Sequence, residues 1–180
     1  MAKRISLREF QQNLSERLVS ARRGEGWNAL LGIESGTEEL PGGSRWLVDL
    51  ADSGEVTPVP ELTPAPLTRQ WFTGIANIRG VLYSVVDFAA WRGGAPTPIN
   101  AQSRLLLIGA RQGVNSALLV RRALGLRPQL EMRAATDVRT GLGETAAWLG
   151  GRFKDTQDVL WTQLRIPALL SDSRYLDIAL

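Results

Sequence analysis

The stretch GIANIRGVLYSVVDF, residues 74–88, tells more about the fold than any other part of the chain. It contains two apolar runs rich in β-branched and aromatic residues, which are typical of strands. Asn77 and Gly80, whose residue types favour turns, stand between the two runs. The stretch therefore predicts two strands joined by a short turn, with Arg79 exposed in that turn.

The second run, VVDF, is expected to enter the core. We expect Val85, Val86 and Phe88 to be buried, because three large apolar side chains in four residues favour burial. Asp87 is expected to anchor the end of the strand rather than to act as a catalytic acid.

The residues that most enzymes and metal sites depend on are absent. The 180 residues include no His and no Cys, which removes imidazole bases, thiolate nucleophiles, phosphohistidines and His/Cys zinc sites. The motifs GxxxxGK[ST], HExxH and GxSxG are also absent. Asp155 and Asp158 would be neighbours on a helix, but nothing around them predicts the apolar pocket that raises a carboxyl pKa. We therefore expect no enzyme, no cofactor and no metal, which favours a binding function.

Charge is concentrated at the start of the chain. The net charge is +3, and residues 1–23 carry six basic and two acidic residues, so 6 − 2 = +4 lies there and 3 − 4 = −1 on the remainder. A nearly neutral body lacks the broad positive surface of phosphate-binding proteins. A nucleic-acid-binding β-barrel, which the overall pI of 9.9 permits, stays the competing hypothesis.

Residues 1–26 predict a basic amphipathic helix. Ser6 and Glu9 have the spacing of a capping box, and Leu7, Phe10, Leu14 and Leu18 fall on one helical face. Gly24 and Gly26 then end the pattern. The helix could pack on the body, bind a partner or lie on a membrane surface, and the sequence leaves these alternatives open. The segment has no apolar signal-peptide core and the chain no run long enough to span a bilayer, so we expect a cytoplasmic protein without membrane insertion.

The rest of the chain predicts short strands separated by glycine and proline. Residues 27–34 and 44–51 predict strands joined by a polar loop, and the proline-rich residues 56–68 are excluded from a central strand. Residues 92–103 predict an exposed loop, and two further apolar runs begin at 104 and 115. A short helix is expected near Pro167. Residues 82–93 and 160–171 share a pattern of strand followed by apolar helical turn, which suits two related halves.

The order of a proline-rich segment, WFTG, NIRG and VVDF resembles the CheW-like family of chemosensory coupling proteins. The resemblance is densest over residues 46–91, is weaker beyond Trp91, and is closest to PilI-type members associated with twitching motility. It implies a mainly β fold, with residues 27–180 forming two small, pseudo-symmetric, five-stranded barrels and a hydrophobic seam between them. An added helix at each end completes the expected fold.

The resemblance also implies a function and a site. Family members are adaptors that couple a chemoreceptor's cytoplasmic helical hairpin to the regulatory domain of a CheA-type histidine kinase, in arrays at the membrane. Type IV pilus twitching motility is the implied output. The family's partner-binding strand and turn fall on Gly74, Asn77, Ile78, Arg79 and Gly80. Arginine suits this role because its planar fork can bond two acceptors at once. A third possibility is the regulatory domain of a larger protein, although the start MAKR and the end DIAL favour a complete chain.

Overall fold

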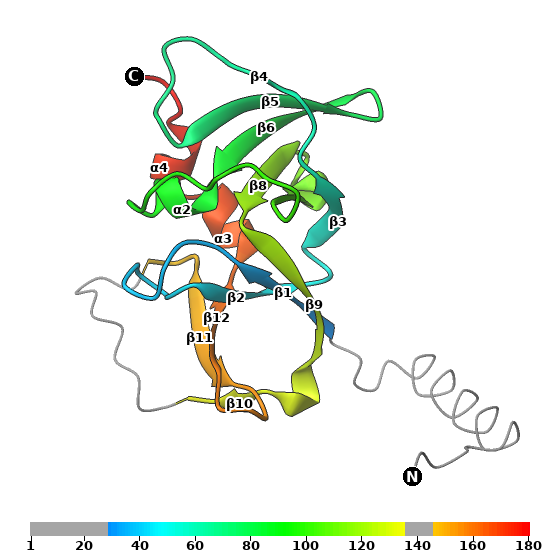
Figure 1. The fold of residues 1–180 in the computed structure, drawn as a ribbon, viewed down its shortest axis with the longest axis vertical. Coiled ribbons are helices and arrows are strands. Elements are labelled where there is room, and N and C mark those ends of the chain that lie inside the picture. Colours follow the sequence, from blue (N-terminus) through cyan, green and yellow to red (C-terminus); the bar gives the residue numbers. More distant parts are fainter. Residues whose placement is uncertain (1–28, 136–145) are drawn as a thin grey trace, which may run out of the picture.

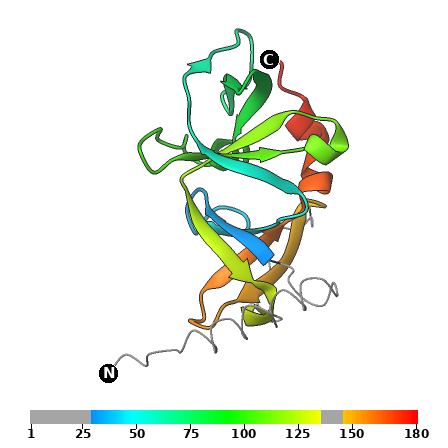
Figure 2. The same ribbon diagram turned by 90° about the vertical axis from the view of Figure 1, so that its right-hand side faces the viewer.

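The computed structural model describes residues 29–135 and 146–180. The expected helix in residues 1–26 lies outside the described residues. Within them the fold is mainly β, as expected, and it contains two six-stranded sheets. In Figure 1 the sheets lie one above the other, and the perpendicular view in Figure 2 keeps them apart as two layers.

The lower sheet in Figure 1, called sheet A, has the strand order β10-β11-β12-β2-β1-β9. Its strands are β1 (Ala29–Glu34), β2 (Arg45–Asp49), β9 (Arg122–Pro128), β10 (Arg133–Ala134), β11 (Leu149–Lys154) and β12 (Leu160–Leu164). The upper sheet, sheet B, has the order β3-β7-β8-β6-β5-β4. Its strands are β3 (Ser53–Pro58), β4 (Leu62–Thr63), β5 (Phe72–Ile78), β6 (Val81–Asp87), β7 (Arg104–Ile108) and β8 (Ser116–Val120).

Each sheet combines strands from both halves of the chain. The hairpin β1–β2 starts the first half but lies in sheet A, where β2 runs parallel to β12. The hairpin β7–β8 starts the second half but lies in sheet B, where β8 runs parallel to β6. The two sheets therefore have the same sequence of pairings, and the two halves exchange their first hairpins.

This arrangement confirms the pattern of a strand followed by a helical turn that the two halves of the sequence share. Residues 82–93 contain β6 and helix α2 (Phe88–Trp91), and residues 160–171 contain β12 and helix α3 (Ile166–Leu170). In both cases the strand that lies parallel to a central hairpin leads into a short helix. Each sheet has six strands where the resemblance implies five, because two-residue strands, β4 and β10, are added at one edge. Closure of the sheets into barrels stays a prediction.

The central hairpins are buried on both sides because apolar residues occupy successive positions along them. In β7, Leu106 and Ile108 face a large cluster that contains residues of both sheets, here called the seam. Leu105 and Leu107 face a smaller cluster within sheet B. Strand side chains alternate between faces, so the unbroken apolar run RLLLI supplies both clusters. The hydrophobic seam that the resemblance implies is therefore present.

Aromatic side chains fill the centre of the seam. The ring of Trp46 lies 5.1 Å from that of Phe88, and Trp91 lies 5.1 Å from Trp148 and 5.8 Å from Tyr175. These pairs are tilted or edge-to-face, the arrangements that aromatic quadrupoles favour. Val85, Val86 and Phe88 are buried as predicted.

The proline-rich segment lies at the edges of sheet B, as predicted, because β3 and β4 are the two outermost strands. Pro167 lies in the first turn of α3, and a second helix, α4 (Ser173–Leu176), follows. Two short helices thus replace the single one expected. The remaining helical turns are the 3-10 segments Ala110–Gln112 and Gln129–Glu131.

Two segments add detail that the sequence did not predict. Residues 155–158, where a helix was considered only as a possibility, form a turn between β11 and β12 in which Asp155 is buried. Residues 92–103 form the predicted loop, most of which is exposed, but Arg92, Thr97 and Ser103 within it are buried. In both segments a buried polar side chain organises the backbone, which composition alone does not reveal.

Candidate functional site

The NIRG segment forms a two-residue hairpin turn at the exposed end of β5 and β6. Ile78 pairs with Val81, so only Arg79 and Gly80 lie between the strands. Their φ angles are 53° and 84°, and two successive positive values are the signature of a type I′ turn. The Asn77 side-chain oxygen accepts a hydrogen bond from the Gly80 amide at 2.9 Å. The predicted turn is confirmed.

Arg79 points into solvent and makes one ion pair. Its side chain is 78% exposed, and its Nη2 atom lies 2.7 Å from Oε1 of Glu55 on β3. An exposed ion pair contributes only about 0–1 kcal/mol to stability. The main effect of Glu55 is therefore to orient the guanidinium while leaving its Nε and Nη1 donors without a bond to any described residue.

The two glycines have different roles. Gly74 is buried with a φ of 133°, and a Cβ atom there would lie 2.4 Å from the Thr63 carbonyl oxygen of β4. The backbone of β4 therefore approaches Gly74 closely, whereas a Cβ at Gly80 would meet no atom within 4 Å. Gly80 is required only for its positive φ.

The five predicted residues do not form one exposed patch. Asn77, Arg79 and Gly80 are exposed at the turn, whereas Gly74 is buried and Ile78 packs against the apolar cluster within sheet B. The sequence reasoning missed two residues beside the turn. Val81 is 41% and Leu82 is 60% exposed. Adjacent strand residues face opposite sides, so two apolar residues in succession after a hairpin turn were a usable signal.

We name the exposed residues Glu55, Arg79, Val81 and Leu82 at this end of the hairpin the tip surface, with Val81 and Leu82 on opposite faces of β6. Leu82 lies opposite Asn77 in the register, one residue pair from the turn. The surface combines an oriented cation with apolar area and is carried by a hydrogen-bonded hairpin. These are features of a docking surface for another protein rather than of a reaction centre.

Asp87 is a structural anchor, in agreement with the prediction. Its side chain is 3% exposed and accepts hydrogen bonds from the amides of Ala89 and Ala90 in the first turn of α2. It also accepts bonds from the amide and the hydroxyl of Thr97. Because these donors occupy both carboxylate oxygens, Asp87 has no free position for acid–base work.

Arg92, at the end of α2, is a buried cation that the sequence reasoning missed. Its guanidinium donates to the carbonyl oxygens of Pro41 and Gly43 at 2.9 Å each, to that of Ser35, and to that of Phe88 in its own helix. Burial lowers the pKa of Arg92 to about 10, and the nearby Asp87 charge partly opposes that shift.

Two aromatic rings complete this environment, since the guanidinium carbon lies 4.6 Å from the Trp46 ring centre and 4.7 Å from that of Phe88. Ser35, Pro41 and Gly43 belong to the β1–β2 loop of sheet A, whereas α2 follows β6 of sheet B. Arg92 thus ties one sheet to the other.

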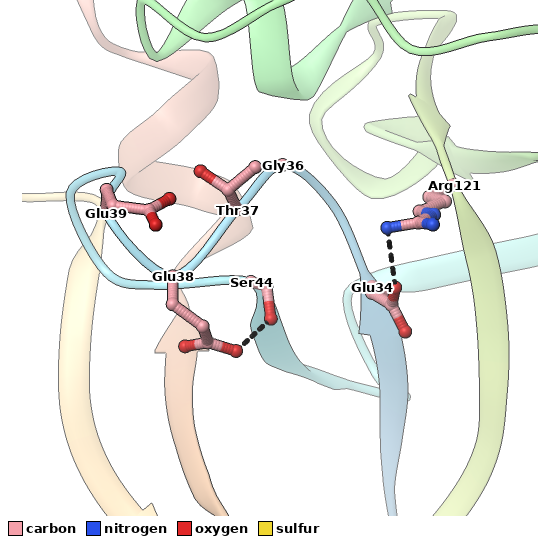
Figure 3. Close-up of a pocket in the computed structure, with 7 residues that line it drawn as sticks. All are labelled: Glu34, Gly36, Thr37, Glu38, Glu39, Ser44 and Arg121. Atoms are coloured by element: carbon pink, nitrogen blue, oxygen red, sulfur yellow. Dashed lines mark hydrogen bonds and ion pairs between the residues drawn. The ribbon is translucent and has the colours of Figure 1, made fainter.

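The same loop borders a pocket of about 330 Å³ lined by Glu34, Gly36, Thr37, Glu38, Glu39, Ser44 and Arg121 (Figure 3). Two of its carboxylates are already bonded within the chain. Glu34 pairs with Arg121 at 3.4 Å and with Arg122 at 2.7 Å, and Glu38 accepts from the Ser44 hydroxyl.

The third carboxylate, Glu39, has a lowered pKa because of a hydrogen bond from Thr37. One exposed carboxylate does not make a binding site. Across residues 29–135 and 146–180, no three Asp, Glu, His or Cys side chains come together in a way that could hold a metal ion.

The sequence model of the family described as "CheW-like domain" matches residues 41–174, which is 134 of the 180 residues. The chain belongs to the CheW-like domain family. The match includes β5, β6, the NIRG turn and Arg92. The resemblance seen in the sequence is therefore confirmed.

Two relatives of this CheW-like chain are informative. It is 29% identical over 86 residues to Protein PilI of Pseudomonas aeruginosa, and the match covers 48% of each protein. The chain thus spans about half the length of that curated relative. The crystal structure of the scaffolding protein TtCheW from Thermoanaerobacter tengcongensis is similar with a TM-score of 0.63 and 20% identity. That likeness covers 84% of this chain and 97% of TtCheW, and it shows the shared fold.

In the part of this CheW-like chain that the structure describes, none of the helices has both the length and the apolar character required to cross a membrane. Its longest described helix, α3, has five residues.

Proposed function

We propose that this CheW-like protein is a non-catalytic adaptor. It couples a methyl-accepting chemoreceptor to the regulatory domain of a CheA-type histidine kinase in a cytoplasmic array at the membrane. Its output is twitching motility driven by type IV pili. Membership of the CheW-like family, the similarity to PilI and the fold shared with a scaffolding protein support this proposal.

The observation that carries the proposal is the oriented, incompletely bonded guanidinium of Arg79 on the tip surface. A receptor hairpin presents carboxylates and helix-end carbonyl groups, and an arginine with two free donors can bond them in a planar, two-point contact. Leu82 supplies apolar area beside it. Because Glu55 already fixes the guanidinium, little side-chain entropy is lost on binding.

The adaptor role needs rigidity more than chemistry. Each partner binds its own surface, and the protein fixes their relative orientation because the seam and Arg92 join the two sheets. Of the five family positions, Arg79 contacts the partner, Asn77 and Gly80 set the turn, and Gly74 and Ile78 attach the hairpin to the sheet.

The competing nucleic-acid function gains no support from the described residues. Arg121 and Arg122, which are adjacent at the end of β8, both pair with Glu34. Their charge is therefore partly neutralised before any phosphate could approach.

The test is co-assembly of the protein with receptor and kinase, together with its thermal midpoint. Arg79→Ala is expected to weaken assembly by at least about tenfold, since charged interface bonds contribute more than 1.4 kcal/mol. The midpoint should stay within about 3 °C, because exposed pairs add little stability.

Arg111→Ala is the matched control, because Arg111 is also an exposed arginine in a turn of sheet B. Unchanged assembly in Arg79→Ala, or an equal loss in both variants, would reject the role of Arg79.

A further inference from the structure

Three exposed leucines surround the point where the described chain begins. Leu126 on β9 is 63% exposed, Leu130 in the following 3-10 turn is 88% exposed, and Leu50 after β2 is 39% exposed. β9 and β2 are the two neighbours of β1, whose first residue is Ala29. We call these three leucines the sheet A patch.

The patch continues the buried side of sheet A beyond the area that sheet B covers. Leu126 is the register partner of Leu31 on β1, and cross-strand partners lie on the same side of a sheet. Leu31 is 6% exposed and belongs to the seam, whereas Leu126 lies one strand further out and is open. The patch therefore extends the apolar surface of the core to residues that remain exposed to solvent.

Two acidic residues lie beside these leucines in the sequence. Asp52 follows Leu50 by two residues, and Glu131 follows Leu130. Neither forms an ion pair within the described ranges. A ligand for this area should be apolar on one side and basic on the other.

The sequence of the first 28 residues predicts an apolar side and a basic side, and this segment joins the described chain at Ala29, beside the patch. Their sequence predicts one apolar helical face with four large side chains, and residues 1–23 carry a net charge of +4. A helix over residues 6–23 would be about 27 Å long at 1.5 Å per residue. Residues 24–28 can span about 17 Å at most, so the end of such a helix cannot lie far from Ala29.

We infer that the N-terminal segment docks on the sheet A patch of its own chain. Its apolar face covers Leu126, Leu130 and Leu50, and its arginines lie beside Asp52 and Glu131. The segment thereby occupies sheet A and leaves the tip surface of sheet B uncovered.

A cross-linking experiment on the full chain tests this placement. The chain has no native cysteine, so the double variant Gln11→Cys with Gln129→Cys contains only two thiols. Gln11 borders the predicted apolar face, and Gln129 is an exposed residue beside Leu130. A flexible bismaleimide reagent in dilute solution should join them within one chain. The matched control joins Gln11→Cys to Ser173→Cys, an exposed site at the start of α4, near sheet B.

The expected result is an intramolecular yield at least about tenfold higher for position 129 than for position 173. Adding Leu126→Asp should lower that yield to the control level, while adding Leu176→Asp, at a similarly exposed leucine in α4, should not. Equal yields at positions 129 and 173 would overturn the inference. Products formed only between two chains would also overturn it, since the patch would then bind a second copy.

Discussion

The two sheets contain equivalent hairpins, β5–β6 in sheet B and β11–β12 in sheet A, and they anchor them in opposite ways. The β11–β12 turn is held by Asp155, which is 8% exposed and accepts hydrogen bonds from the Trp161 indole and from the amides of Gln157 and Val159. The β5–β6 turn is closed by the hydrogen bond from the Gly80 amide to the exposed Asn77 side chain, and its strands are held at their base, where the Gly74 backbone lies against Thr63.

The buried β11–β12 turn therefore serves stability, whereas the exposed β5–β6 turn is the one that we propose for recognition of a partner. Asp155 is buried and accepts its hydrogen bonds from groups within the protein, so its carboxylate is not available to a partner. Arg79 directs its guanidinium outward and adopts a left-handed backbone conformation that costs a non-glycine residue about 1 kcal/mol. Equivalent positions in the two sheets thus provide an internal clamp in one and the contact surface that we propose in the other.

The largest expected effect is at the base of the β5–β6 hairpin. Gly74→Ala places a Cβ 2.4 Å from a backbone oxygen and imposes a strained φ, so we expect about 3 kcal/mol of destabilisation. Gly80→Ala, at a positive φ but in open space, should cost only about 1 kcal/mol. Urea unfolding measures both. Similar losses in the two variants would show that the hairpin is not anchored at its base.

An intermediate effect is expected at the β11–β12 turn. Asp155→Asn should lower the free energy of unfolding by about 2 kcal/mol at pH 7, because an amide replaces a carboxylate that accepts three hydrogen bonds. Burial by itself raises the pKa of Asp155, but the bonds from Trp161, Val159 and Gln157, together with the charge of Arg127, lower it below 3.8 overall.

The pH dependence of that effect follows from the lowered pKa. The carboxylate contributes its full stabilisation above the unfolded-state pKa of 3.8 and loses it as the pH falls through the lower folded-state value. The difference in unfolding free energy between the natural protein and Asp155→Asn should therefore shrink below pH 4. A constant difference from pH 7 to pH 3 would contradict the proposed clamp.

The smallest effect on stability is expected at Arg79 itself. Arg79→Asn gives the Asn-Gly pair that type I′ turns favour, so stability should stay within about 1 kcal/mol of the natural protein or rise. Assembly with receptor and kinase should nevertheless weaken, because the guanidinium is lost. Circular dichroism and a pull-down measure the two properties. A fall in stability with intact assembly would mean that the arginine serves the turn and not the partner.

Local chemistry could be predicted from the sequence where it depends on neighbouring residues. The NIRG turn, the anchor role of Asp87 and the buried residues of VVDF follow from residue types within a few positions. The exchange of hairpins between the sheets could not be predicted, because β2 meets β12 across more than a hundred residues. For the same reason the role of Arg92 could not be predicted, since three of its four carbonyl acceptors lie 49–57 residues away.

The structure around Asp155 could not be predicted from its sequence pattern. The spacing of Asp155 and Asp158 fits a helix, but the actual partner of Asp155 is the indole of Trp161 in the next strand. A buried carboxylate is recognisable only once its donors are known. The exposure of Leu82, in contrast, could have been predicted from strand alternation.

The position of Arg92 has a mechanical consequence. A force applied to the tip surface passes along β6, whose seven residues span about 23 Å at 3.3 Å each, and reaches α2 directly. There the Arg92 guanidinium donates hydrogen bonds to three main-chain carbonyl oxygens in the β1–β2 loop of sheet A. The compact ammonium group of a lysine does not have the planar fork of donors that this arrangement uses. If the tip surface binds a partner as proposed, a displacement of β6 there would reach sheet A through the hydrogen bonds of Arg92.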